Sequence, residues 1–75
     1  MAIKIYSTPA CPYCVLAKNY LKQKGAAFED VDVSRDNAAA QEMIDKSGQM
    51  GVPVLEINGK IIVGFDKKAI DEALK

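Results

Sequence analysis

The alternation of apolar and polar residues near the start of the chain predicts a β-strand followed by an α-helix. In residues 2–6 two isoleucines alternate with Lys4, which is the period of a strand. Residues 12–24 carry apolar side chains at the spacing of one helix face, namely Leu16, Ala17, Tyr20 and Leu21. Gly25 follows at the position where helices often end.

A second strand and a second helix are predicted next. Residues 28–33 alternate imperfectly and indicate a strand. Either Ser34 or Asp36 can supply the N-cap oxygen of the helix that follows, which ends near Gly48. Its apolar residues at helical spacing are Ala39, Met43 and Ile44.

The last third of the chain predicts a β-hairpin and a final helix. Two short apolar runs, 54–57 and 60–63, are separated by Asn58-Gly59. This dipeptide supplies the two positive-φ residues of a type I′ turn. Asp66 can cap a helix that carries Ala69, Ile70, Ala73 and Leu74.

The predicted elements follow the order β-α-β-α-β-β-α, which makes the chain an α/β protein. We expect one domain over residues 1–75. The first β-α-β unit should form a parallel pair with a right-handed crossover. The hairpin adds two antiparallel strands, so the sheet should be mixed, with helices on both faces.

Charge and composition argue against nucleic acids and membranes as binding partners. Ten basic and ten acidic residues cancel, and histidine is absent. No basic patch indicates binding to nucleic acid or to an anionic membrane. No apolar run approaches a membrane span, and Met1-Ala2-Ile3-Lys4 lacks the pattern of a signal peptide. We therefore expect a cytoplasmic protein, with a monomer as the simplest assembly.

Cys11 and Cys14 are the only cysteines, and they lie at the predicted strand-to-helix junction. In a reducing compartment such a pair is catalytic or metal-binding more often than structural. Placing Cys11 before a helix directs unpaired backbone N–H groups and the positive end of the helix dipole at its sulfur, which favours the thiolate. Pro12 suits the first helical position. Cys14 follows by nearly one turn and should lie deeper.

This arrangement predicts thiol–disulfide exchange. Cys11 would attack a target disulfide, and Cys14 would then attack Cys11 and release the reduced target. A structural pair is the less favoured alternative. Two cysteines without histidine cannot complete a four-ligand zinc site within one chain, but a two-coordinate copper(I) site remains open.

Two further motifs are candidates for substrate binding. Pro53 lacks a ladder donor and belongs at the start of a strand, where it can leave the backbone of Val52 free to pair with an extended substrate. The base rate for such bonds alone favours an ordinary trans proline. The backbone amides of Gly64-Phe65-Asp66 could receive a carboxylate. The favoured interpretation of that motif, taken alone, is structural: a strand end, a core aromatic and an N-cap.

Several motifs together resemble the glutaredoxin family, and the resemblance spans essentially the whole chain. They are Ile5-Tyr6, Cys11-Pro12-Tyr13-Cys14 with Ala17-Lys18, Val52-Pro53 and Gly64-Phe65-Asp66. The resemblance implies a thioredoxin fold with three helices around a four-stranded sheet in the order 2-1-3-4. It also implies a cis peptide bond before Pro53.

The resemblance also implies roles for individual residues. Cys11 would be the nucleophile and the glutathionylated sulfur, and Cys14 the resolving thiol. Glutathione would be the reducing co-substrate, with no permanently bound cofactor or metal. Its expected contacts are the side chain of Tyr13, the backbone of Val52 beside Pro53, and the amides of Phe65 and Asp66. Disulfide-containing or glutathionylated proteins would be the targets.

Four positions depart from the usual family pattern. Thr8 stands where lysine often precedes the first cysteine, and Gln49 stands where a basic residue often meets the glycyl carboxylate. Gly51 replaces a threonine, and Lys67 replaces an aspartate. Each lost charge-assisted bond should weaken glutathione binding by about 1–3 kcal/mol.

Alternatives therefore remain at the level of function. The last turn is also similar to that of glutaredoxin-like redoxins that are recharged by thioredoxin reductase and serve ribonucleotide reductase. A copper carrier is ranked lower, because copper chaperones with this cysteine spacing follow the order β-α-β-β-α-β. A glutathione-supported [2Fe–2S] dimer is weaker still, since Pro12 resembles the redox-active members of the family.

Overall fold

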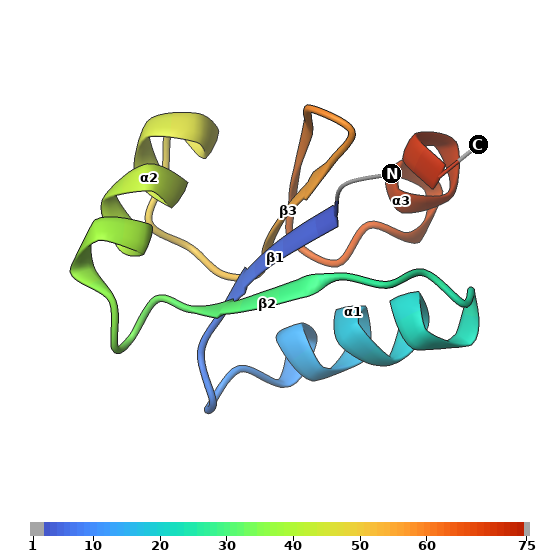
Figure 1. The fold of residues 1–75 in the computed structure, drawn as a ribbon, viewed down its shortest axis with the longest axis horizontal. Coiled ribbons are helices and arrows are strands. Elements are labelled where there is room, and N and C mark those ends of the chain that lie inside the picture. The colour runs from blue at the N-terminus through green and yellow to red at the C-terminus, as the bar shows by residue number, and fades with distance from the viewer. Residues whose placement is uncertain (1–2, 75) are drawn as a thin grey trace.

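The computed structural model describes residues 3–74, and within them the elements follow the predicted order (Figure 1). Their bounds are β1 (Ile3–Ser7), α1 (Pro12–Gln23), β2 (Glu29–Asp32), α2 (Asn37–Ser47), β3 (Val54–Ile57), β4 (Lys60–Val63) and α3 (Lys67–Leu74). None of the helices in this part of the chain has the length and apolar character needed to cross a membrane.

The four strands form one mixed sheet in the order β2-β1-β3-β4. β1 runs parallel to β2 and antiparallel to β3, and β3 pairs with β4 as a hairpin. Asn58 and Gly59 have φ values of 52° and 85°, as a type I′ turn requires. The predicted α/β class and the thioredoxin-type strand order are confirmed.

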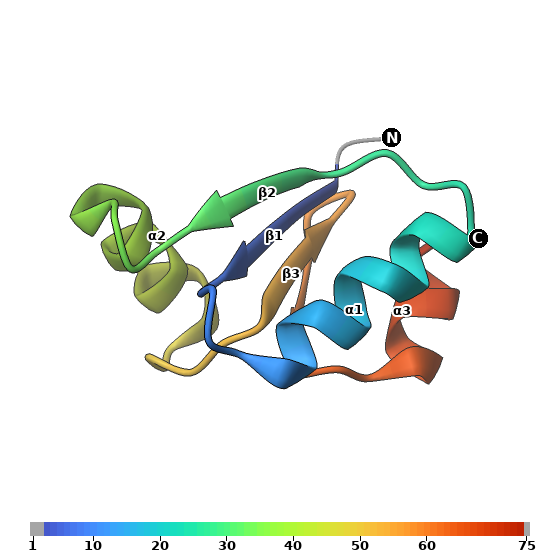
Figure 2. The same cartoon turned by 90° about the horizontal axis from the view of Figure 1, so that it is seen from below.

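The helices cover both faces of the sheet: α1 and α3 lie on one face, and α2 lies on the other (Figure 2). Side chains alternate along β1, so Ile5 points to the α1/α3 side and Tyr6 to the α2 side. The larger core, beneath α1 and α3, contains Ile3, Ile5, Ala17, Leu21, Leu55, Ile57, Ile62, Ile70 and Ala73. The smaller core, beneath α2, contains Tyr6, Met43 and Val54.

One local prediction needs correction, and one open alternative is resolved. The second strand is shorter than residues 28–33, because Phe28 packs against the larger core instead of continuing the ladder. Asp36, not Ser34, caps α2, with its Oδ1 accepting a bond from the N–H of Ala39 at 3.1 Å. The backbone N–H of Ser34 instead donates to Asp32 at 2.9 Å.

The predicted face of the first helix is also partly wrong. Leu16 is 48% exposed, whereas Cys14, Ala17 and Leu21 are buried. The face of α1 that packs against the sheet therefore includes Cys14, and Leu16 lies outside this buried face. The first strand extends to Ser7, and the predicted start at residue 2 lies outside the described residues.

Candidate active site

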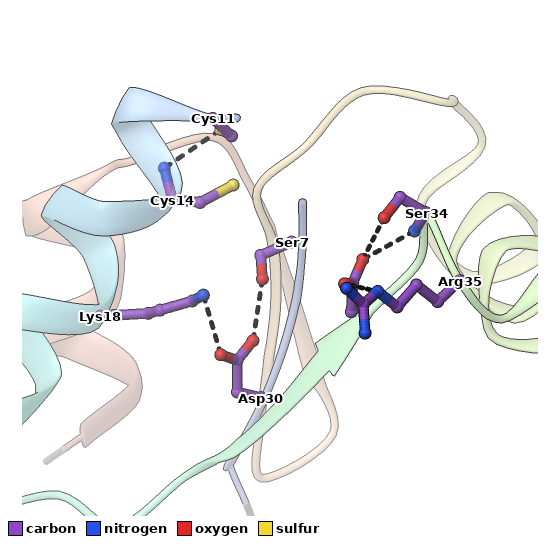
Figure 3. Close-up of polar contacts among 8 residues, drawn as sticks. Ser7, Cys11, Cys14, Lys18, Asp30, Ser34 and Arg35 are labelled. Atoms are coloured by element: carbon purple, nitrogen blue, oxygen red, sulfur yellow. Dashed lines mark hydrogen bonds and ion pairs between the residues drawn. The ribbon is translucent and has the colours of Figure 1, made fainter. Parts of the chain in front are cut away.

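Cys11 occupies the N-cap position of α1, at the point where the chain turns from β1 into the helix. Its backbone is extended, with φ −96° and ψ 110°, and Pro12 takes the first helical position. The backbone N–H of Cys14 donates to Cys11 Sγ at 3.1 Å (Figure 3). The Cys11 side chain therefore caps the helix, at the end where the helix dipole favours negative charge. Cys11 is partly exposed, so its sulfur is open to a target.

Cys14 lies one turn deeper and is fully buried. Burial raises the pKa of its thiol from 9.0 to about 11, with the hydrogen bond to Cys11 as the second cause. Both cysteines are free thiols in this structure. One sulfur is accessible and the next is withheld from solvent, which is the difference in depth predicted from the sequence.

Strand register brings the other predicted motifs to the same end of the sheet as Cys11. Tyr6, near the end of β1, pairs with Val54 at the start of β3, and Val54 pairs with Val63 at the end of β4. The backbone N–H of Gly64 donates to the carbonyl of Pro53 at 2.8 Å, which joins the two loops directly. The loop after β1, the start of β3 and the end of β4 therefore meet at one end of the sheet, although they lie far apart in the sequence.

The Val52–Pro53 peptide bond is cis. The interpretation as an ordinary trans proline, which rested on base rates, is therefore wrong, and the implication of the family resemblance is correct. Pro53 is fully buried, while Val52 is only partly so.

The last turn has the structural features that its sequence predicted. Asp66 Oδ1 accepts a bond from the N–H of Ala69 at 3.1 Å and so caps α3. Phe65 packs against the larger core, with its ring 5.9 Å from that of Tyr20 in an edge-to-face arrangement. The ammonium of Lys67 lies 5.7 Å from the Tyr20 ring centroid and 5.8 Å from that of Phe65. Carboxylate binding by the Phe65 and Asp66 amides stays a prediction.

The remaining predicted contacts surround the cysteine with different exposures. Tyr13 is 63% exposed beside Cys11. Thr8 is partly exposed, and its carbonyl accepts a bond from the N–H of Cys11 at 3.3 Å. Gln49 is exposed and lies over the backbone of Gly51, where an added Cβ would lie 3.2 Å from its Nε2. The glutathione contacts of these residues remain predictions.

Sequence reasoning missed a polar cluster next to Cys14. Ser7 Oγ donates to Asp30 Oδ1 at 2.8 Å, and Lys18 Nζ lies 2.8 Å from Asp30 Oδ2 (Figure 3). Burial opposes ionisation of Asp30, but the bonds from Lys18 and Ser7 outweigh it and lower the pKa of the carboxyl group. Lys18 follows Cys14 by four residues, so helix periodicity could have placed it on the same face. The partner on β2 had no comparable signal.

Comparisons with known proteins agree with this geometry. The glutaredoxin family model matches residues 3–62. The chain is 52% identical over 73 residues to an uncharacterised glutaredoxin-like 8.6 kDa protein of the rubredoxin operon of Clostridium pasteurianum, covering 97% of each chain. It is 38% identical over 64 residues to glutaredoxin 3 of Escherichia coli, covering 85% of this chain and 77% of that protein.

A solved structure adds a second comparison. The glutaredoxin-like protein NrdH-redoxin of Escherichia coli, which is described as having a thioredoxin-like activity profile, superimposes with a TM-score of 0.87 at 28% identity. The superposition covers 96% of this chain and 93% of that one.

Proposed function

Because this chain belongs to the glutaredoxin family, we propose that it is a thiol–disulfide oxidoreductase in which Cys11 is the nucleophile and Cys14 the resolving thiol. The observation that carries the proposal is the difference between the two sulfurs. Cys11 is accessible and receives a backbone donor at the helix N-terminus, whereas Cys14 is buried immediately behind it.

The reaction proceeds by two displacements at sulfur. The Cys11 thiolate attacks a target disulfide, a bond forms between Cys11 and one target sulfur, and the other leaves as a thiolate. Cys14 then loses its proton and attacks Cys11 Sγ, which releases the second target sulfur. The target gains two electrons, and the Cys11–Cys14 dithiol becomes a disulfide.

Glutathione is the proposed electron donor. Two glutathione molecules would return the disulfide to the dithiol, the first forming a mixed disulfide with Cys11. Tyr13, the backbone of Val52 and the amides of Phe65 and Asp66 would hold the tripeptide. The similarity to glutaredoxin 3 and the meeting of these loops beside Cys11 support this assignment. Such a dithiol reductant belongs in a reducing compartment, so we place the protein in the cytosol. A monomer is the simplest assembly.

A second donor, thioredoxin reductase, is favoured by specific observations. Neither Thr8 nor Gln49 supplies the positive charge that a glutathione carboxylate would meet. The NrdH-redoxin, with its thioredoxin-like activity profile, covers nearly the whole chain. In this alternative the electrons would pass from thioredoxin reductase through Cys11 and Cys14 to a protein disulfide such as that of ribonucleotide reductase.

A coupled NADPH assay distinguishes the two donors. One reaction contains glutathione and glutathione reductase, the other contains thioredoxin reductase, and both contain the same disulfide substrate. Faster NADPH oxidation in the first reaction supports glutathione. Faster oxidation in the second would replace it with thioredoxin reductase.

Single-cysteine variants test the roles of the sulfurs. Cys11→Ser should abolish turnover with either donor. Cys14→Ser should keep activity toward a glutathionylated substrate, because that route needs only the first sulfur. Turnover by the Cys11→Ser protein would refute the proposed nucleophile.

A copper carrier is the less favoured assignment. The order β-α-β-α-β-β-α differs from the β-α-β-β-α-β order of copper chaperones with this cysteine spacing. Stoichiometric copper(I) binding without thiol–disulfide exchange would favour it.

A further inference from the structure

The polar cluster formed by Ser7, Lys18 and Asp30 lies next to Cys14 but has no role in the reaction described above. Lys18 lies on the same face of α1 as Cys14, one turn further along the helix. Its ammonium is fixed by the 2.8 Å ion pair with Asp30, which also accepts the bond from the buried hydroxyl of Ser7. Figure 3 shows the Cys14 side chain extending toward Ser7, with Lys18 on the same side of the helix.

The strands hold the cluster rigidly. Ile5 pairs with Asp30 across the parallel β1/β2 ladder, and Ser7 pairs with Asp32. The Asp30 carboxylate therefore projects from a hydrogen-bonded strand and not from a loop. The Lys18 side chain is only 23% exposed, so its position is more restricted than that of an ordinary surface lysine.

Cys14 faces an electrostatic problem in the resolving step. It must become an anion in order to attack, yet it is fully buried. Burial raises its pKa, and the charge of Lys18 acts in the opposite direction. Two other groups have a larger effect on the thiol: Cys11, which raises the pKa, and the backbone at Thr8, which lowers it. Among these causes, Lys18 is the cationic side chain.

On the basis of the proposed function, we propose that Lys18 supplies the counter-charge for the Cys14 thiolate during resolution of the mixed disulfide. Asp30 and Ser7 are positioning residues that hold the ammonium on the side of α1 from which Cys14 extends. In this step the Cys14 proton passes to solvent and the Cys14–Cys11 bond forms. The bond between Cys11 and the target breaks, and the target sulfur leaves with the electron pair.

Asp30 is not the proton acceptor. Its carboxyl pKa is already lowered by Lys18 and Ser7, so it remains ionised and has little affinity for a thiol proton. Its contribution is to keep the Lys18 ammonium from turning outward into water.

The size of the effect follows from the ionisation of Cys14. A neighbouring cation can change a pKa by about one unit. The charge of Lys18 is the smallest of the causes named for the thiol, so removing it should lower the thiolate fraction by up to about tenfold. The more basic thiolate is intrinsically about threefold more nucleophilic, because the Brønsted slope is about 0.4–0.5. The resolving step should therefore slow by up to about threefold.

Stopped-flow kinetics with an activated aromatic disulfide separates the two steps in one trace. The first equivalent of coloured thiolate reports attack by Cys11, and the second reports attack by Cys14. The test variant is Lys18→Met, with Lys18→Gln as a second neutral form and Lys18→Arg as the rescue. Lys22→Met is the matched control, because Lys22 lies one further turn away on the same helix.

We expect Lys18→Met and Lys18→Gln to slow the second phase by up to about threefold, to move its pH profile to higher pH and to leave the first phase unchanged. Lys18→Arg should restore the second phase, and Lys22→Met should leave both phases unchanged. An unaltered second phase in the neutral variants would overturn the inference, as would equal slowing of both phases. If Cys11→Ser retained the first phase, the proposed function itself would fail.

A double-mutant cycle tests the positioning role of Asp30. If Asp30 acts only through Lys18, Asp30→Asn alters the second phase in the otherwise unmodified protein. The same substitution then has no effect in the Lys18→Met background. A persisting effect of Asp30→Asn in that background would refute the positioning role.

Discussion

The burial of Cys14 leads to a measurable difference in its reactivity between the folded and unfolded chain. Its pKa is raised from 9.0 to about 11, chiefly because burial disfavours the thiolate. Two pKa units lower the thiolate fraction about hundredfold at pH 8. A more basic thiolate is intrinsically more nucleophilic, and this raises the reaction rate of the remaining thiolate by about tenfold. Ionisation alone should therefore slow alkylation of Cys14 by up to about tenfold in a variant that lacks Cys11, because Cys11 contributes part of the shift. Exclusion of the reagent from a fully buried sulfur should slow it further.

The assay uses Cys11→Ser, in which Cys14 is the single thiol. The protein is treated with iodoacetamide at pH 8, in buffer and in denaturing urea, and the modified fraction is followed by mass spectrometry. Serine retains a hydroxyl at the helix N-cap, so α1 should be preserved. Cys14→Ser is the control, because its remaining thiol is partly exposed and should not be protected by folding.

Alkylation of the folded Cys11→Ser protein should be at least about tenfold slower than that of the unfolded chain. Rates within twofold of each other would show that Cys14 is neither desolvated nor withheld from reagent. The distinction between an attacking and a resolving sulfur would then lose its structural basis.

Three further predictions concern stability. Between pH 9 and 11 the unfolded chain has lost the Cys14 proton while the folded chain retains it, so raising the pH through this window should destabilise the protein. Urea unfolding should show a smaller alkaline loss in Cys14→Ala, and an equal loss would contradict the raised pKa. Asp36→Ala removes the α2 cap and should lower the free energy of unfolding by about 1 kcal/mol, whereas Asp36→Asn should retain most of it. Leu55→Ala, at a fully buried position of β3, should cost about 2–5 kcal/mol in the same urea assay; a loss below 1 kcal/mol would show that the larger core collapses around the cavity.

Local signals predicted most of the elements correctly. The hairpin over 54–63 has the predicted bounds, because turn chemistry at Asn58-Gly59 fixes the register of both strands. Asp66 caps the last helix as its position indicates. These features depend on residues within a few positions of one another, and a sequence displays such relations directly.

The errors occurred where packing selects among local possibilities. The periodicity of α1 allowed Leu16 on the buried face, but contact with the sheet selected a stripe that contains Cys14. The alternation of residues 28–33 did not show that Phe28 would leave the strand for the core. The cis geometry of the Val52–Pro53 bond was predicted correctly only through the family resemblance, because the base rate for such bonds favours trans.

The sequence by itself determined the order of the elements and the placement of Cys11 at a helix N-terminus. Both follow from short-range periodicity, capping and the two-residue spacing between the cysteines. Only the tertiary structure decided how deeply Cys14 lies and which charges surround it. Lys18 of α1 meets Asp30 of β2 because the helix packs against the parallel β1/β2 pair. The two residues lie far apart along the chain, so no local sequence pattern indicates their contact.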